Sequence, residues 1–475
     1  MIQKVIAQLS KAQFEKLDEE LSENRGEKFS KLLQLYREKE YEDAEIREII
    51  GVKQAAFYTL KSRLFDKVQQ YLFRTSSDNR AELLKNVSSV PYLVYHTPRE
   101  TAISLLLHLE AELKKEDMSA EKVIVYNGLK TLHLHTPLYY QYQQLYNKNV
   151  AYMLALDKAD ELVSVFNREL GEFLLSGDTS KISLFKLYLT EFKKLCALYD
   201  SHRLKINRII ANVSYAVFVD EKHEVPDPDE TVEELLAEFK SILKEHPEHR
   251  NYRFLEPIWQ FLNFEYYHLF GRTKNSQPHY EKLNDSLETF LLLSHSCPAT
   301  HFLIVKHEHE KNMRVKNSPP ENHSLLFHPD PEDVFSCVNL ALNKAACFFH
   351  NGNFSEAASC LNQLLNEISF KNFPFAEAHV KLFLTLNALL AGKSDQAELT
   401  LRSISRKLAG EDLSGRFPAA EAFSRFLKIA LNDSSSSKSK KLETALTEFT
   451  QVNNGHFAVI KYAPLNDVHL GKLSN

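Results

Sequence analysis

Apolar side chains recur every three or four residues through most of the chain, which is the spacing of one face of an α-helix. In residues 101–115 the apolar stripe is made of Ala102, Leu105, Leu106, Leu109 and Leu113. A strand-like pattern is suggested only in the tail, where residues 457–465 (FAVIKYAPL) are expected to be extended. The helical periodicity predicts further helices near 139–156, 157–176, 181–200, 203–219, 230–246, 254–270, 278–293, 333–350, 354–369, 375–391, 394–408, 417–431 and 438–451.

Three polar segments interrupt this pattern. Residues 219–231 (VDEKHEVPDPDET) predict an exposed loop that leads into a helix capped by Asp229 or Thr231. Residues 315–333 predict a longer linker, and the serine-rich residues 432–441 predict a short insert between the last two helices. We therefore expect three parts: a unit at 1–90, a middle block of helical hairpins at 91–314, and a C-terminal block at 332–475.

The C-terminal block contains an internal repeat. Residues 351–364 (NGNFSEAASCLNQL) align with residues 391–404 (AGKSDQAELTLRSI), with each matched pair 40 positions apart. A fixed period of this size indicates stacked helical hairpins, in which glycine ends one helix and alanine lets two helices approach closely. The matched pairs are Gly352 with Gly392, Ala357 with Ala397, and Leu361 with Leu401.

This repeat resembles the tetratricopeptide (TPR) family in its order of small, aromatic, glycine and large residues. It departs from the family in its period, which is 40 rather than about 34 residues, and in lacking the terminal proline. The resemblance implies a superhelix whose surface holds a protein or peptide partner; the alternative is that the hairpins only pack a core. The residues that carry the resemblance are Ala345, Phe348, Gly352, Phe354, Ala357 and Leu361.

The segment 42–68 predicts a short helix, a turn and a longer helix near the N-terminus. Gly51 ends the first helix because a residue in such a turn commonly takes the left-handed conformation. The apolar residues expected to form one shared core are Ile46, Ile49, Val52, Phe57, Leu60 and Leu64, together with Leu32, Leu33 and Leu35 from the preceding helix.

This N-terminal pattern resembles the helix-turn-helix of LuxR-type and sigma-factor-type regulators, with Lys53 and Ala56 as departures. The resemblance implies that the second helix enters the DNA major groove. Residues 53–80 carry six basic and two acidic residues, a net of +4, whereas residues 15–48 carry seven basic and twelve acidic, a net of −5. The alternative is a three-helix unit that packs against the repeats. The possible DNA contacts are Lys53, Gln54, Tyr58, Thr59, Ser62 and Arg63.

Composition narrows the classes of function. Only 12 of 475 residues are glycine, which leaves little room for phosphate-binding loops or tightly turned sheets. The net charge of −5 gives no overall attraction to nucleic acid or membrane. Five scattered cysteines without a CxxC pair indicate neither a disulfide framework nor a zinc site. Charges interrupt the N-terminal residues, and no apolar run approaches about 20 residues, so we expect a cytoplasmic chain without a membrane anchor.

Three polar segments resemble a metal site, a phosphate-binding loop or a catalytic cluster, but each departs from the pattern that such a site requires. His307-Glu308-His309-Glu310 resembles a metal motif, but side chains two apart on a helix point to different faces, and His301 shares no face with His307. In residues 410–416 the two glycines have the spacing of a phosphate-binding loop, but the lysine of such a loop is missing. The polar Glu265–His268 segment lies beside an expected core stripe of Trp259, Leu262, Tyr266 and Phe270.

These observations favour an all-α, non-enzymatic protein without cofactor or metal: a helix-turn-helix-like three-helix unit followed by stacked antiparallel hairpins. The expected function is that of a scaffold or adaptor that binds a protein or peptide partner. The alternative is a transcriptional regulator in which residues 28–72 bind DNA and the repeats sense a partner.

Overall fold

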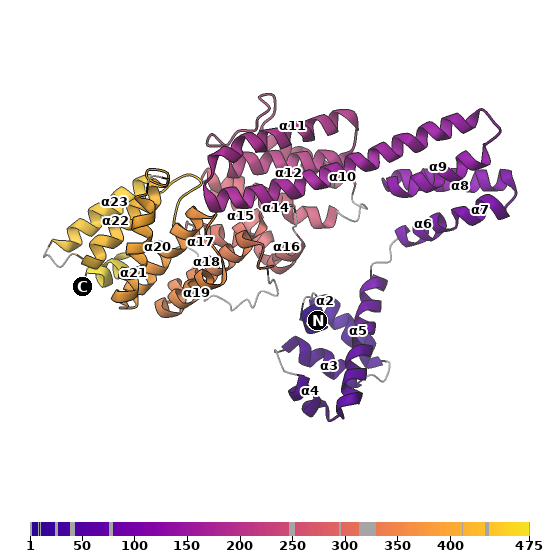
Figure 1. Ribbon diagram of the computed structural model, residues 1–475. Coiled ribbons are helices and arrows are strands. Elements are labelled where there is room, and N and C mark those ends of the chain that lie inside the picture. Colours follow the sequence, from indigo (N-terminus) through magenta and orange to yellow (C-terminus); the bar gives the residue numbers. More distant parts are fainter. Residues whose placement is uncertain are drawn as a thin grey trace. The chain divides into compact units, whose positions relative to one another are not determined.

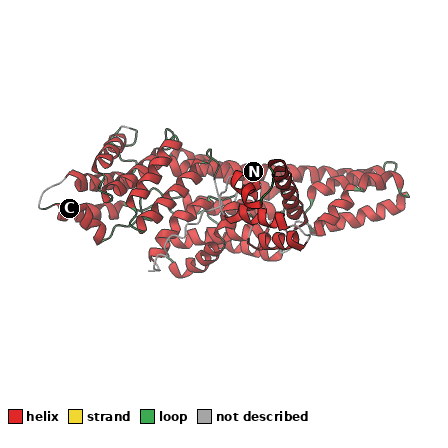
Figure 2. Cartoon of the chain, turned by 90° about the horizontal axis from the view of Figure 1, so that it is seen from below, coloured by secondary structure: helices red, strands yellow, loops and turns green. Residues whose placement is uncertain are grey.

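Helices are the only regular secondary structure in the part of the chain that the computed structural model describes, and Figure 2 shows no strand there. The described residues are 2–7, 9, 11–23, 27–38, 43–75, 79–246, 252–293, 296–312, 329–410, 412–432 and 437–474. No helix in these ranges is long and apolar enough to cross a membrane. Most of the predicted linker at 315–333 and part of the insert at 432–441 lie outside the described residues.

The described chain divides into two compact units, residues 1–155 and residues 156–475. The division falls inside one helix, α10 (Leu138–Ser176), and the three-part division expected from the sequence stays a prediction. The other helices of the first unit are α1 (Ile2–Ala7), α2 (Lys11–Glu23), α3 (Glu27–Glu38), α4 (Asp43–Ile50), α5 (Gln54–Thr75), α6 (Asn79–Ser88), α7 (Val90–His96), α8 (Arg99–Lys115) and α9 (Ser119–Leu132) (Figure 1).

The second unit continues with a longer series of helices. They are α11 (Ile182–Leu198), α12 (His202–Phe218), α13 (Val232–Glu245), α14 (Tyr252–Leu269), α15 (Thr273–Asp285), α16 (Leu287–Leu293), α17 (Phe302–Asn312), α18 (Val334–His350), α19 (Phe354–Glu367), α20 (Pro374–Leu390), α21 (Ser394–Leu408), α22 (Pro418–Asn432), α23 (Lys438–Val452) and α24 (Asp467–Ser474), with short 3₁₀ turns at Thr179–Lys181 and Ala299–His301.

Helices α1 to α5 share one core in the first unit. Ile46, Phe57 and Leu64 are fully buried in it, as the sequence pattern predicted, with Leu32 and Leu33 of α3. Gly51 takes a φ of +70° between α4 and α5, where a side chain would be strained. The expectation for Ile49 was wrong: its side chain is 42% exposed, because Ile50 lies one turn after Ile46 and packs against the core instead.

A second core in the first unit lies among α6 to α10. Leu106, Leu109 and Leu113 are buried there, against Val125 and Leu129 of α9. Leu105 was expected in the same stripe but is 46% exposed. The buried face of α8 is rotated toward Ile103, which packs against this core in its place.

Adjacent helices of the second unit pack in pairs, most closely α14 with α15, α18 with α19, α20 with α21, and α22 with α23. The two turns that align in the sequence are built alike. Gly352 and Gly392 have φ values of +76° and +74°. The next residues, Asn353 and Lys393, each donate a backbone hydrogen bond of 2.9 Å, to the carbonyls of Phe348 and Ala388 respectively.

Two of the helix divisions expected from the sequence differ in the structure, and the structure decides between the two expected caps of α13. The expected helices 139–156 and 157–176 form the single helix α10, because no glycine or proline interrupts residues 138–170. The expected helix 278–293 is two helices, α15 and α16, separated at Ser286. Of the two proposed caps for α13, Thr231 is the residue used, in a reciprocal capping box with Glu234.

The tail after α23 is packed into the second unit. Residues 453–466 are a loop rather than a strand, and Val459 and Ala463 are fully buried in the core of the C-terminal hairpins. The side chain of Asn453 holds the loop closed, because its Nδ2 donates to the Val459 carbonyl and its Oδ1 accepts the Val459 amide, both at 2.8 Å. The tail is therefore an integral part of this unit.

Candidate functional site

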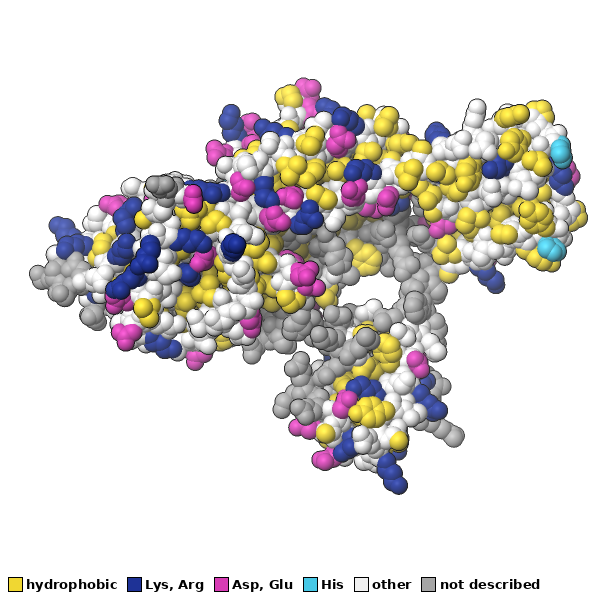
Figure 3. All heavy atoms as spheres, viewed as in Figure 1, with side chains coloured by type: hydrophobic (Ala, Val, Ile, Leu, Met, Phe, Trp, Pro, Cys, Tyr) yellow, Lys and Arg dark blue, Asp and Glu magenta, His cyan; other side chains and the backbone are white. Residues whose placement is uncertain are grey.

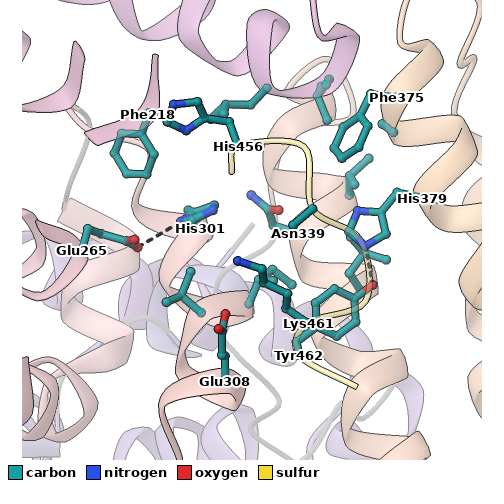
Figure 4. A pocket seen from close by; sticks show the side chains of 18 of the residues that line it. Phe218, Glu265, His301, Glu308, Asn339, Phe375, His379, His456, Lys461 and Tyr462 are labelled. Atoms are coloured by element: carbon teal, nitrogen blue, oxygen red, sulfur yellow. Dashed lines mark hydrogen bonds and ion pairs between the residues drawn. The ribbon is translucent and has the colours of Figure 1, made fainter. Parts of the chain in front are cut away.

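A cavity of about 230 Å³ lies inside the second unit, between the tail and the ends of several helices (Figure 4). Helices α10, α12, α14, α17, α18 and α20 supply its walls, and tail residues 455–462 complete them. Its chemistry-bearing side chains are Glu265, His268, His301, Glu308, Asn339, His379, His456, Lys461 and Tyr462.

The most buried carboxylate in the cavity lining, that of Glu265, is paired with His301. His301 Nδ1 lies 3.0 Å from Glu265 Oε1, and the side chain of Glu265 is only 5% exposed. A buried carboxylate requires such a partner, since an isolated buried charge is strongly unfavourable. The pairing fixes the ring so that Nδ1 faces the carboxylate and leaves Nε2 free of it (Figure 4). The His301 ring also packs against Phe218 in a T-shaped arrangement, with the ring centres 5.2 Å apart.

A second histidine–carboxylate pair joins α14 to α17, with His268 one turn after Glu265 on α14. His268 Nε2 lies 3.6 Å from Glu308 Oε2. Burial by itself would raise the pKa of Glu308, but the contact with His268 and the charge of Lys461 outweigh this effect and lower the pKa, so this carboxyl is ionised near neutral pH. Lys461 reaches into the same space from the tail, beside Glu308 and Asn339 (Figure 4).

The backbone of the tail is strained where it supplies Lys461. Ile460 has a φ of +59°, which a β-branched residue rarely adopts and which costs about 1–3 kcal/mol. His379 holds this conformation, since its Nε2 accepts a hydrogen bond of 3.2 Å from the Ile460 amide. Ile460 and Tyr462 are buried on either side, and the exposed Lys461 between them lines the cavity. The strained residue is thus next to a charged residue of the cavity. Strained backbone conformations are common at ligand sites.

The rest of the lining is apolar. Phe218 and Phe375 are buried, and Phe335 packs half-buried beside Val338 and Leu342 of α18. Small-molecule sites typically combine such apolar walls with a few convergent polar groups. No group of three metal-ligating side chains exists in the described ranges. His307 and His309, the metal candidates from the sequence, bond to Asn343 and Gln277 on different helices.

The sequence analysis did not predict this cavity, although four of the lining residues belong to the polar segments considered there. Glu265 and His268 are one turn apart on α14, and His301 and Glu308 are two turns apart near α17. Such spacing places each set on one helix face, but nothing in the sequence shows that the two faces meet. Of the expected core stripe beside them, Trp259, Leu262 and Tyr266 are buried, whereas Phe270 is 43% exposed.

The residues that carry the repeat resemblance lie at the packed turns of the C-terminal hairpins. Ala345, Ala357, Leu361 and Ala397 are completely buried, and Phe354 and Leu401 nearly so. Phe348 is half-buried against the same core. Gly352 and Gly392 occupy the two equivalent turns.

The six possible DNA contacts all belong to α5 or to the residue before it. Lys53, Gln54, Tyr58, Thr59, Ser62 and Arg63 are exposed. Gln54, Tyr58 and Ser62 follow one another at intervals of four residues, so they share one face of the helix. The basic Lys61 nearby is paired with Asp43 at 2.6 Å.

A third feature is the aromatic end of the first unit, by which we mean Tyr92, Tyr95, Leu134, Leu138 and Tyr140. These residues surround the α7–α8 and α9–α10 turns, which Arg99 joins by donating to the Leu132 carbonyl at 2.7 Å. Tyr92, Tyr95 and Tyr140 are 63%, 76% and 72% exposed. Figure 3 shows hydrophobic side chains gathered on the surface of α8, α9 and the start of α10.

No protein-family model, curated protein or solved structure matches this chain.

Proposed function

We propose that this protein is a helical-repeat scaffold that binds a protein partner through the aromatic end of its first unit. The carrying observation is the exposure of three tyrosines and two leucines around two joined turns. Exposed clusters of apolar side chains mark interaction surfaces, and tyrosine is enriched among the residues that dominate binding energy. The proposal includes a TPR-like superhelix for the paired helices of the second unit and no enzymatic role.

The position of the tail limits where a partner can bind to the repeats. A peptide partner was expected on the repeat surface, but Val459, Tyr462 and Ala463 of the tail already pack into the C-terminal hairpins. That part of the repeats is therefore filled by the chain itself. The aromatic end supports partner binding better, because its tyrosines make little contact with the rest of the described chain.

Affinity capture from the native host with the full chain tests this proposal. The double variant Tyr92→Ser, Tyr95→Ser is compared with the control Leu399→Ser, which removes an equally exposed apolar side chain from the second unit. We expect a partner that the wild type and the control retain and the double variant loses by more than about tenfold, as for a hot-spot aromatic. Capture of the same proteins in the same amounts by all three chains would contradict the proposal.

DNA binding by the first unit is the second candidate, in a regulator whose repeats sense a partner. The observation that favours it is the exposure of all six possible contacts on and before α5, after a glycine turn of helix-turn-helix type. Lys53 and Arg63 would contact phosphates, while Gln54, Tyr58, Thr59 and Ser62 would face base edges.

Gel-shift titration of the full chain with random duplex DNA at two salt concentrations tests this alternative. We expect salt-sensitive binding that the double variant Lys53→Ala, Arg63→Ala weakens, because each phosphate contact contributes to the salt dependence. The control Lys222→Ala, Lys393→Ala removes two exposed lysines of the second unit. Binding that is absent, or equal in both double variants, argues against the regulator.

A further inference from the structure

The cavity of the second unit contains a lysine whose charge acts on Glu308 but which forms no direct ion pair with it. Lys461 makes no hydrogen bond or ion pair of 4 Å or less with the residues that the structure describes. It nevertheless reaches into the cavity beside Asn339, whose amide donates one hydrogen bond of 3.2 Å to Thr300 Oγ1 and has a second N–H (Figure 4). Together, these two side chains offer donors to a carboxylate.

The same cavity contains carboxylate oxygens that are open to a ligand. Glu308 pairs with His268 through Oε2, which leaves Oε1 for another donor, and its side chain is 29% exposed. Glu265 lies deeper behind His301. A ligand with only a negative charge would be repelled by Glu308, and a ligand with only a positive charge would be repelled by Lys461.

Aromatic and aliphatic side chains form the remaining wall. Phe218, Phe335 and Phe375 surround the charged groups together with Ile304 and Val305. The cavity volume of about 230 Å³ lies below the range of about 300–1,000 Å³ that is typical of pockets for drug-sized ligands. The occupant is therefore a small molecule with an apolar body and both charges.

We propose that this cavity binds a free α-amino acid with an apolar side chain. Its carboxylate is held by Lys461 and Asn339, its ammonium group by Glu308, and its side chain by the phenylalanine wall. The Ile460 conformation, held by His379, places the backbone of Lys461 at the cavity before the ligand arrives, so that only its side chain has to be ordered on binding. This site is independent of the aromatic end and of the partner proposed for it.

Isothermal titration calorimetry of the full chain tests the proposal with leucine, valine and phenylalanine as probes. Isocaproate, which lacks the ammonium group of leucine, and isoamylamine, which lacks its carboxylate, are the matched ligands. We expect saturable binding of at least one amino acid. If this is leucine, both single-charge ligands bind at least about tenfold more weakly, since each loses a charge-assisted contact; for another amino acid, its own deaminated and decarboxylated analogues take their place.

Variants connect the binding to the cavity. Lys461→Met and Glu308→Gln are each expected to weaken binding at least about tenfold. The controls Lys222→Met and Glu356→Gln, which remove exposed charges outside the cavity, are expected to bind as the wild type does. Because Lys461 is exposed, its variant remains informative if Glu308→Gln impairs folding. Three results overturn the proposal: no heat with any of the amino acids at millimolar concentration, equal affinity for a single-charge analogue, or wild-type affinity in Lys461→Met.

Discussion

His379 of α20 and Tyr462 of the tail are joined by a hydrogen bond of 3.0 Å across 83 positions of sequence. The same His379 Nε2 accepts the backbone amide of Ile460 at 3.2 Å. A backbone amide can only donate, so Nε2 carries no proton and the ring is neutral. Burial raises the pKa of the Tyr462 hydroxyl well above its usual value, so this hydroxyl remains protonated and donates. The tail is thus attached to α20 by a histidine in one defined protonation state.

The first prediction separates the two contributions of Tyr462. Tyr462→Phe removes only the hydroxyl and is expected to lower the free energy of unfolding by about 1 kcal/mol. Tyr462→Ala also leaves a cavity beside Phe383, where the rings now lie 5.3 Å apart, and is expected to cost about 3–5 kcal/mol. Urea denaturation measures both. Similar small losses for the two variants would contradict the packing of the tail.

The second prediction concerns the stability of the fold at acidic pH. Burial lowers the pKa of His379 from 6.5 to about 4, so the folded protein resists protonation that the unfolded chain accepts. Its contribution to stability is therefore complete above pH 6.5 and is lost as the pH falls toward 4. A pKa difference of one unit corresponds to about 1.4 kcal/mol, so this loss is about 3–4 kcal/mol at most.

The variant His379→Gln isolates this contribution, because glutamine can accept the same amide but does not titrate. Its free energy of unfolding is expected to fall less steeply than that of the wild type between pH 6.5 and 4. The comparison is needed because burial also lowers the pKa values of His279 and His309 to about 4. Denaturant titrations at a series of pH values measure the difference, and parallel curves would rule out the role of His379.

The sequence predicted the helices of this protein far better than its cavity. Helical periodicity and the glycines at 352 and 392 are local signals, and the helices around them begin and end within about two residues of the predicted positions. Ile49 and Leu105 were misplaced because a helix can rotate slightly about its axis, and only its neighbours decide which flanking residue becomes buried. The roles proposed for the N-terminal contacts stay predictions.

The cavity could not be predicted for a different reason. Its charged residues lie on α14, α17 and the tail, and their meeting depends on how distant segments pack. Lys461 in particular was part of a stretch expected only to be extended, and its position depends on the unusual backbone of Ile460. The sequence does contain a local signal, because polar residues lie one or two turns apart on otherwise buried helices. This spacing shows that the residues share one side of a helix, but it does not show which other segment lies opposite that side.

The third prediction compares two glycines with similar backbone angles. Gly177 has a φ of +68°, and an added Cβ would lie 2.5 Å from Cε1 of Phe417. Gly392 has a φ of +74° with no atom within 4 Å of that position. Gly392→Ala is therefore expected to cost about 1 kcal/mol from backbone strain alone, whereas Gly177→Ala must also displace a buried ring and is expected to cost about 3 kcal/mol or more. Thermal and urea unfolding measure both, and equal costs would contradict the close packing of Gly177 on Phe417.

The last prediction tests whether the exposed tyrosines Tyr92 and Tyr95 stabilise the folded protein. Tyr126 lies in the same helical block and is buried, with its hydroxyl 2.7 Å from Glu110 Oε1. Tyr126→Ser is expected to lower the free energy of unfolding by about 3–5 kcal/mol.

Tyr92→Ser and Tyr95→Ser, by contrast, are each expected to change it by less than about 0.5 kcal/mol, because these side chains are already in water. Urea unfolding of the three variants makes the comparison within one residue type and one block. A large loss from Tyr95→Ser would mean that this side chain stabilises the fold, and the case for a partner surface would weaken. A negligible loss would mean that folding does not need these aromatic groups, so that their contribution is to be sought in binding.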